Sequence, residues 1–135
     1  MKKIFLSIIV MVFIFIGWNI YNENENLTKG ILNIKSVPSS IQNIECDSWG
    51  FTDILTACVF KINPTQFPLL LKGWNFTKTN VNYSYSHDIG GPKLGKNFLI
   101  NESYIVHPKD YIHGGHVRVS TDKNNSNVII DIYIE

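Results

Sequence analysis

Residues 53–62 read DILTACVFKI, and this stretch decides the fold. From Ile54 to Ile62, an apolar, threonine or cysteine side chain falls at every second position. Such alternation, rich in β-branched and aromatic residues, predicts a strand with one buried face. Cys46 precedes the stretch, and if it lies opposite Cys58 on an antiparallel neighbour, residues 47–51 form the connection. The sequence therefore predicts a hairpin with a long loop.

A short helix is predicted directly after this strand, over residues 63–73. Asn63 is placed to cap it, Pro64 suits its first position, and Gln66 suits the third position of a capping box. Gly73 supplies a left-handed stop. The apolar face expected to pack on the sheet consists of Phe67, Leu70 and Leu71.

The remaining pattern predicts further strands over residues 41–46, 74–86, 98–106, 117–120 and 128–134. Residues 88–96 hold three glycines and a proline and are expected to form a loop. The last two strands form a hairpin across residues 121–127. The expected class is α+β, with a small, mostly antiparallel sheet of about five or six strands and one short helix packed on one face.

A transmembrane or signal segment is expected ahead of this domain. Lys2 and Lys3 precede an apolar run from Ile4 to Trp18, and no clear cleavage site follows. We therefore expect residues 1–21 to be a retained signal anchor, with the N-terminus in the cytoplasm. Cleavage, giving a secreted protein, is the alternative.

The rest of the chain divides into two parts. Residues 22–31 are almost entirely polar, so they are expected to form a tether. Residues 32–135 are expected to form one exported domain, which faces the periplasm or the outside from a single-pass anchor in the cell membrane.

Cys46 and Cys58 stand in neither a C-x-x-C pair nor a metal-type spacing. In an oxidising compartment they are expected to form one disulfide. Closing this loop is expected to stabilise the folded state by on the order of 3 kcal/mol, because it lowers the entropy of the unfolded chain. Two buried free thiols are the alternative, and a catalytic thiol lacks any sign of a cationic or histidine partner.

Charge argues against nucleic acid as a partner. The chain holds 12 basic and 11 acidic residues, and without Lys2 and Lys3 its net charge falls to −1. No basic footprint remains for a phosphate backbone. Nucleotide binding is not expected either, because Gly90 to Lys96 fits a phosphate-loop frame that Asn97 then breaks.

Three histidines close together, His107, His113 and His116, could supply imidazole ligands to a transition metal. Their spacing matches no named site, and Gly114 with Gly115 makes the segment floppy, so a histidine-rich surface turn is the alternative. Neither Ser48 nor Ser103 lies in a G-x-S-x-G frame, and the carboxylates stand in no recognisable pair. No catalytic residue and no cofactor is predicted.

Aromatic side chains are the remaining candidates for binding. Trp49 and Phe51 lie on the loop of the predicted disulfide hairpin, and Trp74 follows the helix. Tryptophan offers a large contact area with one polar group, which suits a protein partner. The function expected is a membrane-anchored, exported binding module without catalytic activity, such as an envelope accessory protein or an inhibitor or immunity protein. A histidine-based metal-binding module is the alternative.

Overall fold

The computed structural model describes residues 2–84 and 94–135, with the side chains of residues 2–8, 80 and 82–84 left out of the description. It has an α+β fold with one six-stranded antiparallel sheet and a helix packed on it. The elements along the chain are α1 (Lys2–Leu32), β1 (Gln42–Trp49), β2 (Ile54–Lys61), η1 (Pro64–Leu71), β3 (Thr77–Ser84), β4 (Leu99–Val106), β5 (Gly115–Thr121) and β6 (Asn127–Ile134).

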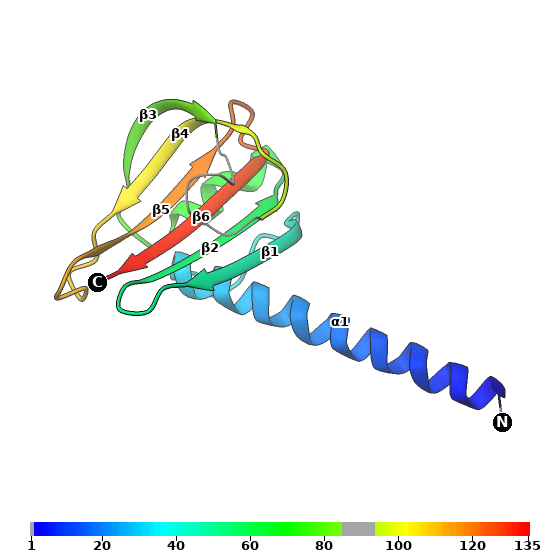
Figure 1. Cartoon of the computed structure of the whole chain (residues 1–135). Helices are drawn as coiled ribbons and strands as arrows, with labels where there is room; N and C mark the ends of the chain where they lie inside the picture. Colours follow the sequence, from blue (N-terminus) through cyan, green and yellow to red (C-terminus); the bar gives the residue numbers. More distant parts are fainter. Residues whose placement is uncertain (1, 85–93) are drawn as a thin grey trace.

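The strands lie in the order β1-β2-β6-β5-β4-β3, and every neighbouring pair is antiparallel (Figure 1). The sequence prediction of this class is confirmed, as are the β1–β2 and β5–β6 hairpins. The connection predicted over residues 47–51 is wrong, because residues 47–49 pair with β2 and the turn lies over residues 50–53. The strand predicted over residues 74–86 begins at Thr77 in the structure. Its last two residues and most of the predicted loop over 88–96 lie outside the described residues.

Strand β2 lies inside the sheet and is buried on both faces, so the prediction of one buried face is wrong. Cys58 and Phe60 face the core that α1 and η1 cover. Ala57 and Val59 face the other side, where Leu94 and other apolar side chains cover them. The alternation correctly identified the face with Cys58 and Phe60 as buried. It could not show that residues from later in the chain cover the face with Ala57 and Val59.

The predicted helix over residues 63–73 forms as the 3-10 helix η1. Asn63 caps it as expected, since its side chain accepts a hydrogen bond from Thr65 N. The Gln66 side chain instead accepts from Ser40 N and so ties η1 to the preceding loop. Gly73 does not adopt a left-handed conformation: a Cβ there would clash with the carbonyl oxygen of Leu32, so glycine permits close packing.

Helix α1 continues through the segment predicted to be a tether, so an unstructured tether over residues 22–31 is wrong. Thr28, Ile31 and Leu32 are buried against the sheet. Their burial offsets the ordering cost that the polar sequence alone could not offset. The helix ends at Leu32, and the next residue, Asn33, adopts φ 53° while Ile34 N donates to Lys29 O, a Schellman-type ending.

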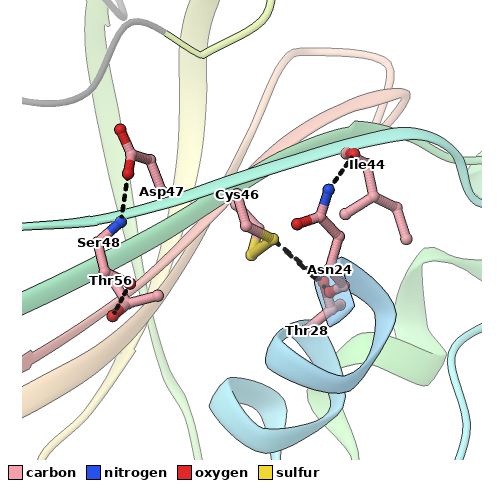
Figure 2. Close-up of a disulfide and its surroundings, with 8 residues drawn as sticks. Asn24, Thr28, Ile44, Cys46, Asp47, Ser48 and Thr56 are labelled. Atoms are coloured by element: carbon pink, nitrogen blue, oxygen red, sulfur yellow. Dashed lines mark hydrogen bonds between the residues drawn. A yellow bond between two sulfur atoms is a disulfide. The ribbon is translucent and has the colours of Figure 1, made fainter. Parts of the chain in front are cut away.

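The last turns of α1 also contact the disulfide hairpin (Figure 2). Cys46 and Cys58 are direct partners in the β1–β2 register and form the predicted disulfide. Asn24 Nδ2 donates to Ile44 O, and Cys46 Sγ lies 3.6 Å from Asn24 O and 4.0 Å from Thr28 Oγ1. The edge strand β1 is therefore held by β2, by a covalent bond and by α1.

The first half of α1 projects away from the sheet (Figure 1). Every side chain from Ile9 to Tyr21 is exposed, including eleven large hydrophobic ones. Within the part of the chain that the structure describes, no helix is long and apolar enough to cross a membrane. The predicted membrane segment is not confirmed.

A compact turn joins β5 to β6. The carboxylate of Asp122 accepts hydrogen bonds from Ser126 N, Ser126 Oγ and Asn127 Nδ2. Partial burial would raise the pKa of Asp122, but these donors together outweigh it and lower the pKa below its usual value. The turn thus depends on an ionised carboxylate.

Candidate functional site

Two loops lie together at one end of the sheet. The register pairs Ile54 with Ile134 and Ile134 with Gly115, which places the turn of residues 50–53 and the loop of residues 107–114 at the same end. Figure 1 shows these loops on either side of the C-terminus. We call this end, with residues 50–54, 107–114 and Glu135, the loop rim.

The loop rim exposes large apolar side chains. Phe51 is fully exposed, Ile112 is 84% exposed, and Ile54 is 53% exposed. Gly50 adopts φ 129°, and a Cβ there would clash with Asp53 O, so the turn that carries Phe51 requires glycine at this position. Both loops therefore present a hydrophobic side chain to solvent from a defined backbone.

The three aromatic residues predicted to bind a partner have different surroundings. Phe51 stands free on the rim, as described above. Trp49 is half-buried at the end of β1 and packs against the Ala57 and Val59 side of the sheet. Trp74 is packed against the core on the α1 side, and its indole N–H donates to Ile31 O at 3.0 Å. Trp74 thereby fixes the end of α1.

Two of the three predicted metal ligands come close together. The ring centres of His107 and His116 are 6.2 Å apart. His107 Nδ1 lies 2.8 Å from Gly115 O, and His116 Nε2 lies 3.0 Å from Asp131 Oδ1. His113 is exposed on the connecting loop. Among the residues that the structure describes, no three His, Cys, Asp or Glu side chains form a group that could hold a metal ion.

Asp131 is the centre of a polar cluster on this face of the sheet. It is only 5% exposed, although it lies within the apolar sequence of β6. Arg118 Nε donates to Asp131 Oδ2 at 2.9 Å, and Arg118 Nη2 donates to Oδ1 at 3.2 Å. Together with His116, this two-point ion pair supplies the partners that a buried carboxylate requires.

Tyr133 extends this cluster to the loop rim. Its ring centre lies 5.8 Å from that of His116, and its hydroxyl donates to Asp53 Oδ2 at 3.2 Å. Partial desolvation and the negative charges of Asp53 and Glu135 raise the pKa of Tyr133 above its usual value. The phenol therefore stays protonated near neutral pH, as its hydrogen bond to Asp53 requires.

A shallow groove of about 700 Å³ lies between α1 and the sheet. The α1 wall includes three carboxamides and the sheet wall includes three isoleucines, namely Asn19, Asn22, Asn26, Ile54, Ile132 and Ile134. The groove contains one carboxylate, from Glu23, and no basic residue. It offers mixed contacts and no arrangement of catalytic groups.

Sequence reasoning missed two residues of this region. Ile112 was overlooked because the loop was considered only for its histidines. The sequence analysis gave Asp131 no role, although a single acid between Ile130 and Ile132 in an apolar strand is a signal of a paired, buried charge. No protein-family model, no curated protein and no solved structure matches the chain.

Proposed function

We propose that the chain is a membrane-attached binding module without catalytic activity, whose sheet lies outside the cytoplasm and contacts a protein partner through the loop rim. The observation that carries this proposal is the continuity of α1. One helix joins an apolar, exposed half to an end that is buried in the domain.

The exposed half of α1 supports attachment to a membrane. From Ile9 to Ile16 every side chain is exposed, so the helix is apolar all round and buries no face against its own domain. A helix of this kind needs an apolar environment. The apolar run starts at Ile4 in the sequence, ahead of the first described side chain, and together with Trp18 and Tyr21 it approaches the length of a membrane span.

The disulfide supports a location outside the cytoplasm. Disulfides persist in oxidising compartments and are rare in the cytosol. Cys58 is fully buried, and its bond to Cys46 lies between β1, β2 and α1. Lys2 and Lys3 favour a cytoplasmic N-terminus, which supports a domain on the other side of the membrane.

The loop rim is the surface that best suits a protein partner. Phe51 and Ile112 project from separate loops, and a large exposed hydrophobic side chain of this kind typically anchors an interface. Trp49, which directly precedes the first loop, is half-buried against the Ala57 and Val59 side of the sheet. Trp74 is left out of the proposed surface because its indole N–H is already bonded to Ile31 O.

Fractionation of cells tests the attachment. The full chain is expected in the membrane fraction and is released only by detergent. The double variant V10K/I14K places two charges in the apolar half, each costing about 3 kcal/mol at the centre of a bilayer, and is expected to lose retention. Asn22→Lys, beyond the apolar run, is the matched control. Retention of the double variant at the parent level contradicts the proposal.

Two further measurements test location and partner binding. Alkylation of the freshly denatured chain from cells is expected to find no free thiol, whereas two reactive thiols would contradict export. Photo-crosslinking residues placed at Phe51 or Ile112 are expected to give one discrete adduct, and the same residue at Asn124, at the opposite end of the sheet, is expected to give none. Equal labelling from all three positions would argue against a contact surface at the loop rim.

A further inference from the structure

The hydrogen bond of His107 fixes which of its ring nitrogens carries a proton. His107 Nδ1 lies 2.8 Å from Gly115 O, and a carbonyl oxygen only accepts. Nδ1 is therefore the protonated nitrogen, and Nε2 of the neutral ring keeps its lone pair. Gly115 itself adopts φ 136°, where a Cβ would clash with Tyr133 O, so the backbone that presents this carbonyl requires glycine here.

The same reasoning applies to His116 on β5. Its Nε2 lies 3.0 Å from Asp131 Oδ1, and Arg118 pairs with the same carboxylate. An ionised carboxylate accepts hydrogen bonds and donates none, so Nε2 of His116 is protonated. The lone pair of the neutral ring is then on Nδ1.

These two hydrogen bonds are the supporting contacts that metal-binding histidines typically have. A histidine ligand donates its other ring N–H to a carboxylate or a backbone carbonyl, which fixes its tautomer and raises its basicity. His107 has the carbonyl of Gly115 and His116 has the carboxylate of Asp131. At about 2 Å per metal–nitrogen bond, two imidazoles that share one ion have ring centres roughly 4.5 Å apart when the N–metal–N angle is about 90° and roughly 6.3 Å apart when the arrangement is linear, so a separation near the upper limit corresponds to two rings on opposite sides of the ion. The observed separation is 6.2 Å.

We propose that His107 and His116 form a two-imidazole site for a divalent transition metal ion, with Cu²⁺ the preferred ion. The ligating atoms are Nε2 of His107 and Nδ1 of His116. Imidazole suits copper and zinc, and copper binds most tightly among the divalent ions of the first row. Since no third protein ligand of the described chain joins the pair, solvent completes the coordination.

The surroundings of the pair allow an ion to enter. His107 is exposed, and the His116 side chain is 22% exposed. The charge of Arg118 is balanced by Asp131, to which it is doubly bonded. Asp53 and Glu135, which accept from Tyr133, add negative charge nearby. This proposal does not depend on attachment to a membrane or on a protein partner.

Titration with Cu²⁺ alone, followed by electron paramagnetic resonance, tests the site. The full chain in detergent is expected to bind one ion with hyperfine splitting from two imidazole nitrogens. His107→Ala is the decisive variant, because His107 is exposed and its loss leaves the core intact. It is expected to weaken binding at least tenfold and to remove one nitrogen from the spectrum. His116→Ala is expected to do the same.

His113→Ala and His87→Ala are the matched controls, and both are expected to keep the affinity and spectrum of the parent. The proposal is overturned if His107→Ala keeps the parent affinity and two nitrogens, or if His113→Ala weakens binding as much as His107→Ala does. Should His116→Ala fail to fold because Asp131 loses a partner, the comparison of His107→Ala with His113→Ala decides alone.

Discussion

Breaking the disulfide between Cys46 and Cys58 should lower the free energy of unfolding by about 3 kcal/mol, the chain-entropy value for a loop of this size. The two cysteines are 12 residues apart in the sequence and face each other in the β1–β2 register. Their bond holds β1, which lies at the edge of the sheet that the described residues form and pairs there with β2 alone. For a domain of this size, the loss corresponds to a fall in melting temperature of roughly 10 to 15 °C.

The measurement is denaturant unfolding of the full chain in a fixed detergent, with and without reductant, followed by tryptophan fluorescence. Trp74 is a suitable reporter because its indole packs against the core and bonds to Ile31 O. The double variant C46A/C58A should lose about 1 kcal/mol more than the reduced chain, since Cys58 is fully buried and its truncation leaves a small cavity.

The control uses the register pair two positions along the same strands, Ser48 and Thr56, whose hydroxyls are 2.8 Å apart. The variant S48A/T56V should lose no more than about 1 kcal/mol and should keep the full response to reductant. The reasoning is refuted if the oxidised and reduced parent chains differ by less than about 1 kcal/mol, or if reductant also destabilises C46A/C58A.

Three further predictions concern single positions. Gly115→Ala should destabilise the domain by about 1 to 3 kcal/mol in thermal unfolding, because φ 136° is strained for alanine. The control is Gly30→Ala in helix α1, where nothing lies within 4 Å of an added Cβ, and it should be neutral or stabilise the domain by up to about 1 kcal/mol. The hydroxyls of Ser103 and Ser120 form a buried hydrogen-bonded pair 2.6 Å apart. Ser103→Ala and Ser120→Ala should each lower the free energy of unfolding by about 1 to 3 kcal/mol, because each leaves the other hydroxyl without its partner. In denaturant unfolding, the double variant should lose less than the sum of the two single losses. Asp122→Ala should remove the stabilisation that the ionised carboxylate gives to the folded state. That stabilisation is present above the usual carboxyl pKa and is lost as pH falls through the lowered pKa, so the free energies of unfolding of variant and parent should converge in acid. A difference that stays constant with pH would contradict the ionised turn.

The sequence predicted those parts of the fold that depend on local pattern. The β1–β2 hairpin followed from the spacing of Cys46 and Cys58, and the η1 cap followed from Asn63 and Pro64. It did not predict the helical state of residues 22–31, because what stabilises that segment is the burial of Thr28 and Ile31 against strands far along the chain. Tertiary packing overrode composition there.

The candidate site was predictable only in part for the same reason. The proximity of His107 and His116 was visible in the sequence, but their hydrogen bonds to Gly115 O and Asp131 depend on the pairing of β5 with β6. The sequence also did not show why residue 115 is a glycine. Gly115 adopts φ 136° beside Tyr133 O, where a Cβ would clash, so the backbone requires glycine at this position.

Because α1 is one continuous helix, the orientation of the sheet about the helix axis is fixed relative to the apolar half of α1. Each residue of an α-helix turns the chain by about 100° and advances it by about 1.5 Å. Inserting one residue between Asn19 and Asn24 would therefore turn the loop rim to a different side of the apolar half of α1 while moving it only about 1.5 Å along the helix axis. Seven inserted residues would restore nearly the original direction. The number of residues in this helix therefore determines the direction in which the loop rim faces relative to the apolar half of α1.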